Sequence, residues 1–266
     1  MSAKSSSYKH PEAVSTSAFE IRDISLEAPW RWIRLGWQGM WKSPAVSLSY
    51  GLMFAIVSAG LAWGMFQIEA SSVLPALAAG FMLVGPILAM GLYETSRRLE
   101  TGERPSFGAA LRALLGSSNQ VRFAGVMLMF ILLVWMRIAT LMFALFFGME
   151  YPTLTDFIST LLFTPAGIGM LVVGTVVGAF FAFVVFAISA VSIPLLMVHD
   201  MDAVTAAATS VKAVLRNPAA LILWGWIITV IMIAGILTAF VGLILAFPLV
   251  GHATWHAYKD LVKKAA

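Results

Sequence analysis

The sequence predicts an all-α fold: a polytopic membrane helix bundle of about six transmembrane helices, built as three αα-hairpins with cytoplasmic amphipathic helices. Three observations predict it: an apolar composition, long uncharged stretches, and basic residues confined to the ends of those stretches. Of 266 residues, 60% are hydrophobic and 11% are charged, and the mean hydropathy is +0.90. Soluble domains carry about 25% charged residues, so lipid is the natural solvent for this chain.

The composition also excludes several classes of function. The chain has no cysteine, which excludes disulfides, thiolate-bound clusters and thiol chemistry. The net charge of +4 could indicate nucleic-acid binding. The basic residues flank apolar segments instead, so membrane topology explains them better, and we expect no nucleic-acid partner.

The first 24 residues differ from the remainder of the chain. They are polar and Ser-rich, and no apolar core follows a basic start, so they do not form a signal peptide. Too few apolar groups are present to offset the entropy of ordering. We therefore predict a disordered cytoplasmic tail over residues 1–24 and a single six-helix transmembrane domain over 25–262.

An amphipathic, Trp-rich helix is predicted directly after the tail, at 25–42. Its apolar stripe is Trp30, Ile33, Trp37 and Trp41, and its polar side is Arg31, Arg34, Gln38 and Lys42. Tryptophans beside basic residues are typical of helices that lie at the lipid headgroup boundary.

The apolar stretches place the spans at about 45–66, 73–93, 122–147, 166–198, 219–236 and 240–258. The last two come from one uncharged stretch, 219–250. As a single helix it would be about 48 Å long, whereas the hydrocarbon core is about 30 Å thick. We therefore expect a tight turn between Gly235 and Gly242. A short outer helix is predicted at 151–163, with Thr153 and Asp156 as a capping pair.

The basic residues set the orientation. All Lys and Arg except Arg137 lie before the first span, between the second and third, between the fourth and fifth, or after the sixth. An excess of Lys and Arg marks the cytoplasmic face. Six spans with both termini in the cytoplasm fit this pattern. A five-span chain would put Lys259, Lys263 and Lys264 outside.

The hairpins also share local sequence features. Pro44 and Pro218 each begin a span after a basic and a small polar residue. Pro86, Pro194 and Pro248 lie near the cytoplasmic ends of the second, fourth and sixth spans, where we expect them to bend the helices. Internal repeats of this kind occur in transporters and in proteins that transport nothing.

Five motifs carry a resemblance to a known family. They are Gly85-Pro86, 92–102 (LYETSRRLETG), Arg137, 143–148 (FALFFG) and 248–258 (PLVGHATWHAY). Over about residues 30–262 the chain resembles a bacterial family of predicted integral membrane proteins of unknown function, some members of which are labelled cytochrome c oxidase subunits. The resemblance implies a multi-pass protein of the bacterial inner membrane. It brings no catalytic or cofactor-binding residues.

The histidines test the oxidase label. A catalytic haem–copper subunit needs several His ligands deep in its helices. Here His199, His252 and His256 lie near the cytoplasmic ends of spans, so we reject that function and keep an accessory subunit. These three histidines and Glu94 lie at the same level of the membrane and are weak candidates for a metal site. The alternative is that they pack beside lipid headgroups at the interface. We predict no catalytic residues, no cofactor and no metal.

Arg137 is the most informative single residue. It lies 15 residues beyond Arg122, about 22 Å into the membrane, where a guanidinium costs at least about 2.5–3.5 kcal/mol. Arg137 is therefore a candidate anion or lipid site. The structural alternative is a snorkelling or ion-paired arginine whose partner is Glu69, Glu150 or Asp156.

Three functions follow from these observations. The first is a non-enzymatic scaffold or accessory subunit of an inner-membrane (respiratory) complex. The second is a small transporter or channel for a solute or lipid, with Arg137 in the pathway. The third is a membrane enzyme, for which only Glu94 and the three membrane-level histidines offer chemistry. The expected partners are membrane lipids, including anionic headgroups at the cytoplasmic face, and other membrane subunits.

Overall fold

The computed structural model describes residues 19–148 and 152–264. The helices are α1 (Ala28–Lys42), α2 (Pro44–Gln67), α3 (Leu74–Leu88), α4 (Met90–Thr101), α5 (Phe107–Leu115), α6 (Asn119–Phe147), α7 (Leu154–Phe163), α8 (Pro165–Ser189), α9 (Ser192–Val198), α10 (Ala203–Arg216), α11 (Pro218–Leu237) and α12 (Leu243–Leu261). A short 3-10 turn, η2 (Ser71–Val73), precedes α3, and the strands are β1 (Phe19–Ile21) and β2 (Val262–Lys264). The predicted all-α membrane bundle is confirmed, apart from this small sheet.

Each predicted span coincides with helical structure. Among the described residues, five segments are long and apolar enough to cross a membrane, by length and composition: α2, 71–101, α6, 165–198 and α11. The sixth predicted span is α12, a separate helix, and the turn before it contains Ala239 and Phe240 at positive φ. Residues 218–261 therefore form two helices. The role of α12 as a sixth span stays a prediction, because polar residues fill its second half.

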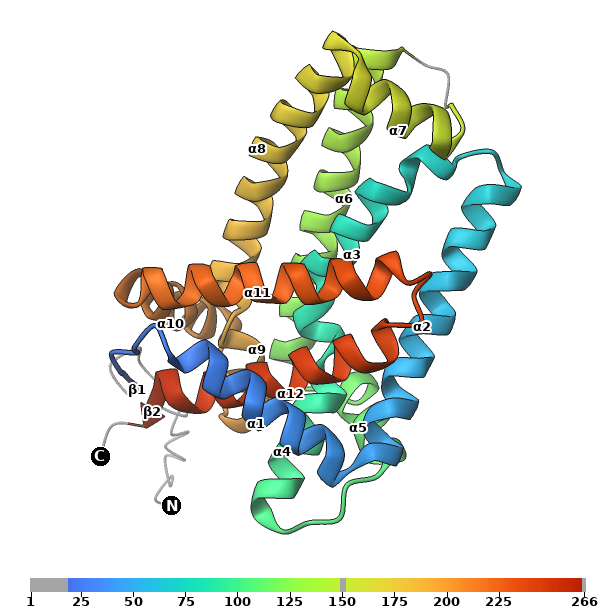
Figure 1. Cartoon of the computed structure of the whole chain (residues 1–266). Helices are drawn as coiled ribbons and strands as arrows, with labels where there is room; N and C mark the ends of the chain where they lie inside the picture. The colour runs from blue at the N-terminus through green and yellow to red at the C-terminus, as the bar shows by residue number, and fades with distance from the viewer. Residues whose placement is uncertain (1–18, 149–151, 265–266) are drawn as a thin grey trace, which may run out of the picture.

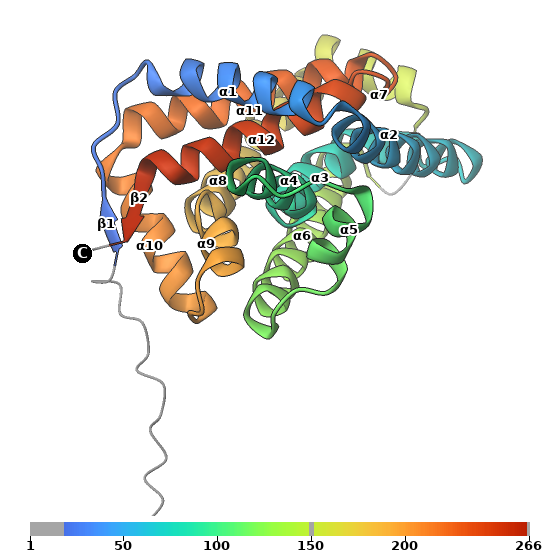
Figure 2. The same cartoon turned by 90° about the horizontal axis from the view of Figure 1, so that it is seen from below.

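The helices form two groups that cross each other. In Figure 1, α2, α3, α6 and α8 run up the view, while α11 and α12 lie across them. Seen from below, α1, α11 and α12 form a layer along one face of the other helices (Figure 2). The elements that carry the Lys and Arg clusters lie toward the lower half of Figure 1, and α7 lies at the opposite end.

Two of the three predicted proline bends are breaks between helices. The chain breaks at Ala89, three residues after Pro86, and again just before α9, which contains Pro194. Proline lacks the N–H that a helix interior uses, which suits Pro194 to the first turn of α9; Pro86 lies inside α3, and its missing N–H does not account for the break that follows it. At the first break the Tyr50 hydroxyl donates to the carbonyl of Leu88 at 2.7 Å. The third proline, Pro248, lies inside α12 without interrupting it.

Helix α12 is the centre of the packing. It contacts α1, α2, α4 and α11, and glycines bring these backbones close together. A Cβ on Gly36 of α1 would lie 2.7 Å from the backbone nitrogen of Ala253. A Cβ on Gly235 of α11 would lie 2.9 Å from a methyl of Leu243. By contrast, α3 packs mainly against α6 and α8, and α2 diverges from it beyond their connecting turn.

One face of the amphipathic helix α1 is buried against the bundle, which the sequence analysis did not predict. Trp30, Trp37 and Trp41 are exposed, as the headgroup-boundary prediction requires. The buried face instead contains Trp32 and Met40, which pack with the glycines of α1 against the layer of α11 and α12. The helix therefore docks on the bundle and keeps its tryptophan stripe free.

The prediction that residues 1–24 are disordered is wrong for its last part. Residues 1–18 lie outside the described residues, but Phe19–Ile21 form β1, which pairs antiparallel with β2 at the other end of the chain. Phe19 and Ile21 are both buried. Two apolar side chains on one face of a strand provide the burial that a polar tail lacks. Both ends of the described chain thus lie together.

The close approach of α1 and α12 leads to a first prediction. Gly36→Ala forces apart two backbones, so we expect it to lower the free energy of unfolding by about 1–3 kcal/mol. Gly60→Ala is the control, because a Cβ there meets nothing within 4 Å; it should be neutral or stabilising by up to about 1 kcal/mol. Thermal unfolding in detergent measures both, and equal midpoints would contradict the packing described here.

Candidate functional site

Arg137 lies on the outward face of α6. The exposed residues of this helix form a line at helical spacing, with Val126, Phe130 and Leu133 before Arg137 and Leu141 after it. Each of the four apolar side chains is more than half exposed. Arg137 is therefore in the middle of an apolar surface stripe, which we call the α6 stripe, and not inside the bundle.

This position is unusual for a charged side chain. Arg137 is 10 residues before the end of α6, or about 15 Å along the helix axis. Charged residues within transmembrane segments almost always face the bundle interior or a water-filled cavity. Neither Glu69 nor Asp156 forms an ion pair with Arg137 among the described residues, and Glu150 lies outside them. Nothing described on this chain neutralises the charge.

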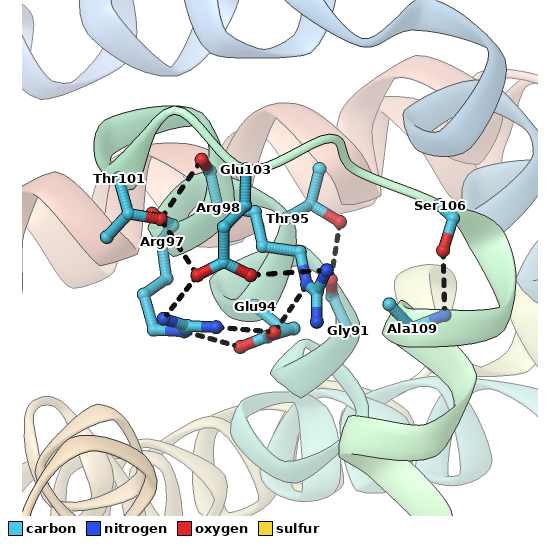
Figure 3. A network of polar contacts seen from close by, with 9 residues as sticks. All are labelled: Gly91, Glu94, Thr95, Arg97, Arg98, Thr101, Glu103, Ser106 and Ala109. Atoms are coloured by element: carbon cyan, nitrogen blue, oxygen red, sulfur yellow. Dashed lines mark hydrogen bonds and ion pairs between the residues drawn. The ribbon is translucent and has the colours of Figure 1, made fainter.

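A second cluster of charges lies at the end of α4 (Figure 3). Glu94 accepts from the guanidinium groups of both Arg97 and Arg98, at 2.7 and 2.6 Å. Glu103 closes the network, because the chain reverses at Gly102 with a φ of 74° and brings its carboxylate to 3.3 Å from each arginine. Glu94, Arg97, Arg98 and Glu103 thus form one ion-pair network.

His252 of α12 is fully buried. Its Nε2 is 2.9 Å from Ser47 Oγ of α2, and its Nδ1 is 2.6 Å from Ser96 Oγ of α4. All three side chains are buried. A hydroxyl both donates and accepts, so either tautomer of the imidazole is satisfied. The three residues join three distant parts of the chain.

The four weak candidates for a metal site each interact with other residues. His252 is enclosed by its two serines, and Glu94 is taken up by its arginines. His256 lies 3.9 Å from Glu100, while His199 Nε2 is 3.3 Å from the hydroxyl of Tyr258. Within residues 19–148 and 152–264, no three potential ligands gather as a metal site would require.

The junction of α10 and α11 ties down the N-terminal strand. Asn217 Oδ1 accepts from the backbone N–H of Ile24 at 2.7 Å, and its amide donates to the carbonyl of Arg22 at 2.9 Å. Beside it, Arg216 donates to both carboxylate oxygens of Asp23, which lowers the pKa of Asp23. With the β1–β2 pairing these bonds form what we call the terminal latch.

His199 lies against the terminal latch. Its ring meets the ring of Phe19 edge-on, with 4.9 Å between centroids. Burial lowers the pKa of His199 below its ordinary value, and the positive charges of Lys264 and Lys259 act in the same direction. The neutral imidazole is therefore the form that the folded latch favours.

Sequence reasoning missed the residues that surround the histidines. Ser47 and Ser96 are ordinary small polar residues within helices, and 205 and 156 positions separate them from His252. Asp260 was also missed; it accepts from the indole N–H of Trp32 at 2.6 Å. The one available signal was that a polar residue in a membrane helix needs a partner, which does not identify the partner.

Comparison with known proteins gives one match. The model of a family described as predicted integral membrane protein (DUF2189) matches residues 73–198. That segment runs from the start of α3 to the end of α9 and includes Arg137. The match confirms the resemblance to a family of integral membrane proteins of unknown function. Searches of curated proteins and of solved structures found no match.

The buried histidine gives a second prediction. Ser96→Ala leaves the Nδ1 of His252 without a partner, so we expect the free energy of unfolding to fall by about 1–3 kcal/mol. Ser189→Ala is a matched control, because this buried serine donates only to Val185 O within its own helix. Chemical unfolding in detergent distinguishes them. Equal losses in the two variants would show that the bond to His252 has no special weight.

The terminal latch gives a pH prediction. The folded pKa of His199 is depressed below its ordinary 6.5, so the unfolded chain binds the proton first. Latch stability is full above about pH 6.5 and declines as the pH falls toward the folded pKa. We expect the protection factors of the Arg22 and Ile24 amides, which donate to Leu261 O and Asn217 Oδ1, to fall between pH 7 and about pH 5 once the slower intrinsic exchange at low pH is corrected for. His199→Gln should remove this dependence, and an unchanged pH profile in the variant would contradict it.

Proposed function

We propose that this integral membrane protein is a non-enzymatic scaffold or accessory subunit of a complex in the bacterial inner membrane. The oxidase label that some members of the similar family carry is the reason to name a respiratory complex. The observation that carries the proposal is the position of Arg137 within the exposed α6 stripe. A charge there indicates that the stripe meets something other than hydrocarbon.

A helix of another subunit suits the stripe best. An isolated guanidinium in hydrocarbon is costly, and an opposite charge with good hydrogen-bond geometry offsets much of that cost. The proposed partner presents a carboxylate to Arg137 from its own membrane helix. Phe130, Leu133 and Leu141 would pack around that ion pair and exclude lipid and water. Arg137 would then lie in the interior of a larger assembly, where charged membrane residues normally lie.

The orientation in the membrane is part of the same proposal. The Lys and Arg clusters and both described chain ends lie toward one end of the molecule, which supports cytoplasmic termini. A cavity of about 360 Å³ at that end is lined by Arg98, Arg112 and Ser118, among others. We propose that anionic lipid headgroups bind there, each nearby basic residue contributing about 1 kcal/mol.

The alternative function was a small transporter or channel with Arg137 in its pathway. Such a pathway runs through the interior of a bundle. Arg137 is exposed on the outer surface of α6, so this observation gives the transporter less support than the subunit.

The test is purification of the native complex in mild detergent followed by mass spectrometry of intact assemblies. We expect a membrane partner with the wild-type chain and at least about tenfold less of it with Arg137→Leu, because a desolvated charge pair contributes more than about 1.4 kcal/mol. Arg122→Leu removes the same charge near the start of the same helix, where Arg122 bonds Asn119, and should keep the partner.

Two outcomes would contradict the proposal. One is an equal yield of partner from Arg137→Leu and wild type. The other is a lone wild-type protein that loses a bound phospholipid on Arg137→Leu, which would identify Arg137 as a snorkelling lipid contact. A charge reversal on the partner that rescues Arg137→Glu would be the strongest support.

A further inference from the structure

A cavity of about 220 Å³ lies among α3, α6, α7 and α8, at the end of the molecule remote from the latch. Its walls are mainly apolar and include Trp135, Ala139 and Phe143 of α6 and Gly174 of α8. Apolar cavities of about 150 Å³ already hold a benzene molecule. This cavity therefore has room for a ligand of at least that size.

One polar group in the wall has no partner. Ser72 is 4% exposed, and its hydroxyl oxygen is buried without a hydrogen bond among the described residues. It is the one side-chain atom of this kind in the part of the chain that the structure describes. The adjacent Ser71 accepts from the N–H of Leu154 at the start of α7. Buried hydroxyls are rarely left unpaired, so Ser72 indicates a bound group that supplies the acceptor.

The cavity is elongated along the helices. Its lining runs from Phe143 to Trp135 on α6, a distance of about 12 Å at the helical rise. Ser72 and Phe157 of α7 lie at the outer end, and Gly174 lies deeper. Thr140 and Leu171 belong to the lining and are also exposed on the side of the bundle. A ligand can thus enter sideways from the membrane.

We propose that this cavity binds one acyl chain of a membrane phospholipid, with its ester carbonyl accepting the hydrogen bond of Ser72. The ester of a phospholipid lies directly above its acyl chain, which is the order of a polar outer end and an apolar interior found here. A lateral opening between membrane helices also favours a lipid over a water-soluble ligand. This site is separate from the α6 stripe, because Met136 and Ala139 line the cavity while Arg137 faces outward.

The test is photolabelling of the full chain in vesicles of phosphatidylethanolamine and phosphatidylglycerol. A phospholipid with a diazirine near the end of one acyl chain is the probe, and labelled positions are mapped by peptide mass spectrometry. We expect labels concentrated on the cavity walls, at Trp135, Ala139 and Gly174. Labels on Phe130 and Leu133 of the exposed stripe give the background from bulk lipid.

Two variants and their controls decide the result. Gly174→Leu fills the cavity without meeting an atom at Cβ, and Gly60→Leu adds the same group at another open glycine. We expect only the first to reduce labelling of the walls to background. Ser72→Ala should reduce wall labelling about fivefold, the worth of one neutral hydrogen bond. Without added lipid it should not lower the unfolding temperature, since the hydroxyl has no hydrogen-bond partner within residues 19–148 and 152–264. Ser189→Ala should leave the labelling unchanged.

Wall labelling no higher than that of the stripe would overturn the proposal. So would wall labelling that survives Gly174→Leu in a folded variant. If Gly174→Leu does not fold, the test rests on Ser72→Ala. Undiminished wall labelling in that variant would contradict the proposed hydrogen bond and therefore the proposed lipid site.

Discussion

The packing of α12 is the constraint on which the other features depend. Its neighbours α1, α2, α4 and α11 come from separate parts of the chain, and glycines such as Gly36 and Gly235 allow close backbone contact. Close contact alone leaves the helices free to slide. His252 removes that freedom, because an imidazole buried in an apolar interior has to meet both Ser47 and Ser96. The register set there places β2, which directly follows α12, beside β1, and it positions the Glu94 network on α4.

The polar groups at the two ends of the molecule differ in whether they have partners on the same chain. At the latch end, buried or half-buried polar groups have partners on the same chain: His252 with its serines, Glu94 with its arginines and Asn217 with the backbone of β1 and its continuation. Toward the other end, the guanidinium of Arg137 and the hydroxyl of Ser72 have none among the described residues. Unpaired polar groups in an apolar medium are costly. This contrast is the reason that both proposals place an outside molecule at an unpaired group.

The limits of the helices could be predicted from the sequence, but the buried side of each helix could not, for a physical reason. Apolar stretches and prolines set the helix limits, so α2 and α11 begin at Pro44 and Pro218. A span such as α2 or α8 is apolar all round, and its sequence carries no periodic signal for the side that is buried. The outward position of Arg137 and the burial of Trp32 follow from tertiary packing alone. The serine partners of His252 could not be identified either, because a distance in sequence does not give a distance in space.

The distribution of buried residues shows that the helices have fewer internal contacts toward the end remote from the latch. In α8 the buried residues are Gly167 near its start and Val185, Ala187 and Ser189 near its end; the middle of the helix is largely exposed. In α2 the buried residues likewise lie mainly in the first half, between Val46 and Ala55, where this helix packs against α12. A helix fixed mainly at one end relies on its surroundings to position the other end, and in a membrane those surroundings are lipid tails or another helix. Neither a lipid tail nor an apolar helix binds to an apolar helix surface with much specificity unless a polar group takes part. In the two proposals, Arg137 and Ser72 provide that selectivity on opposite sides of α6.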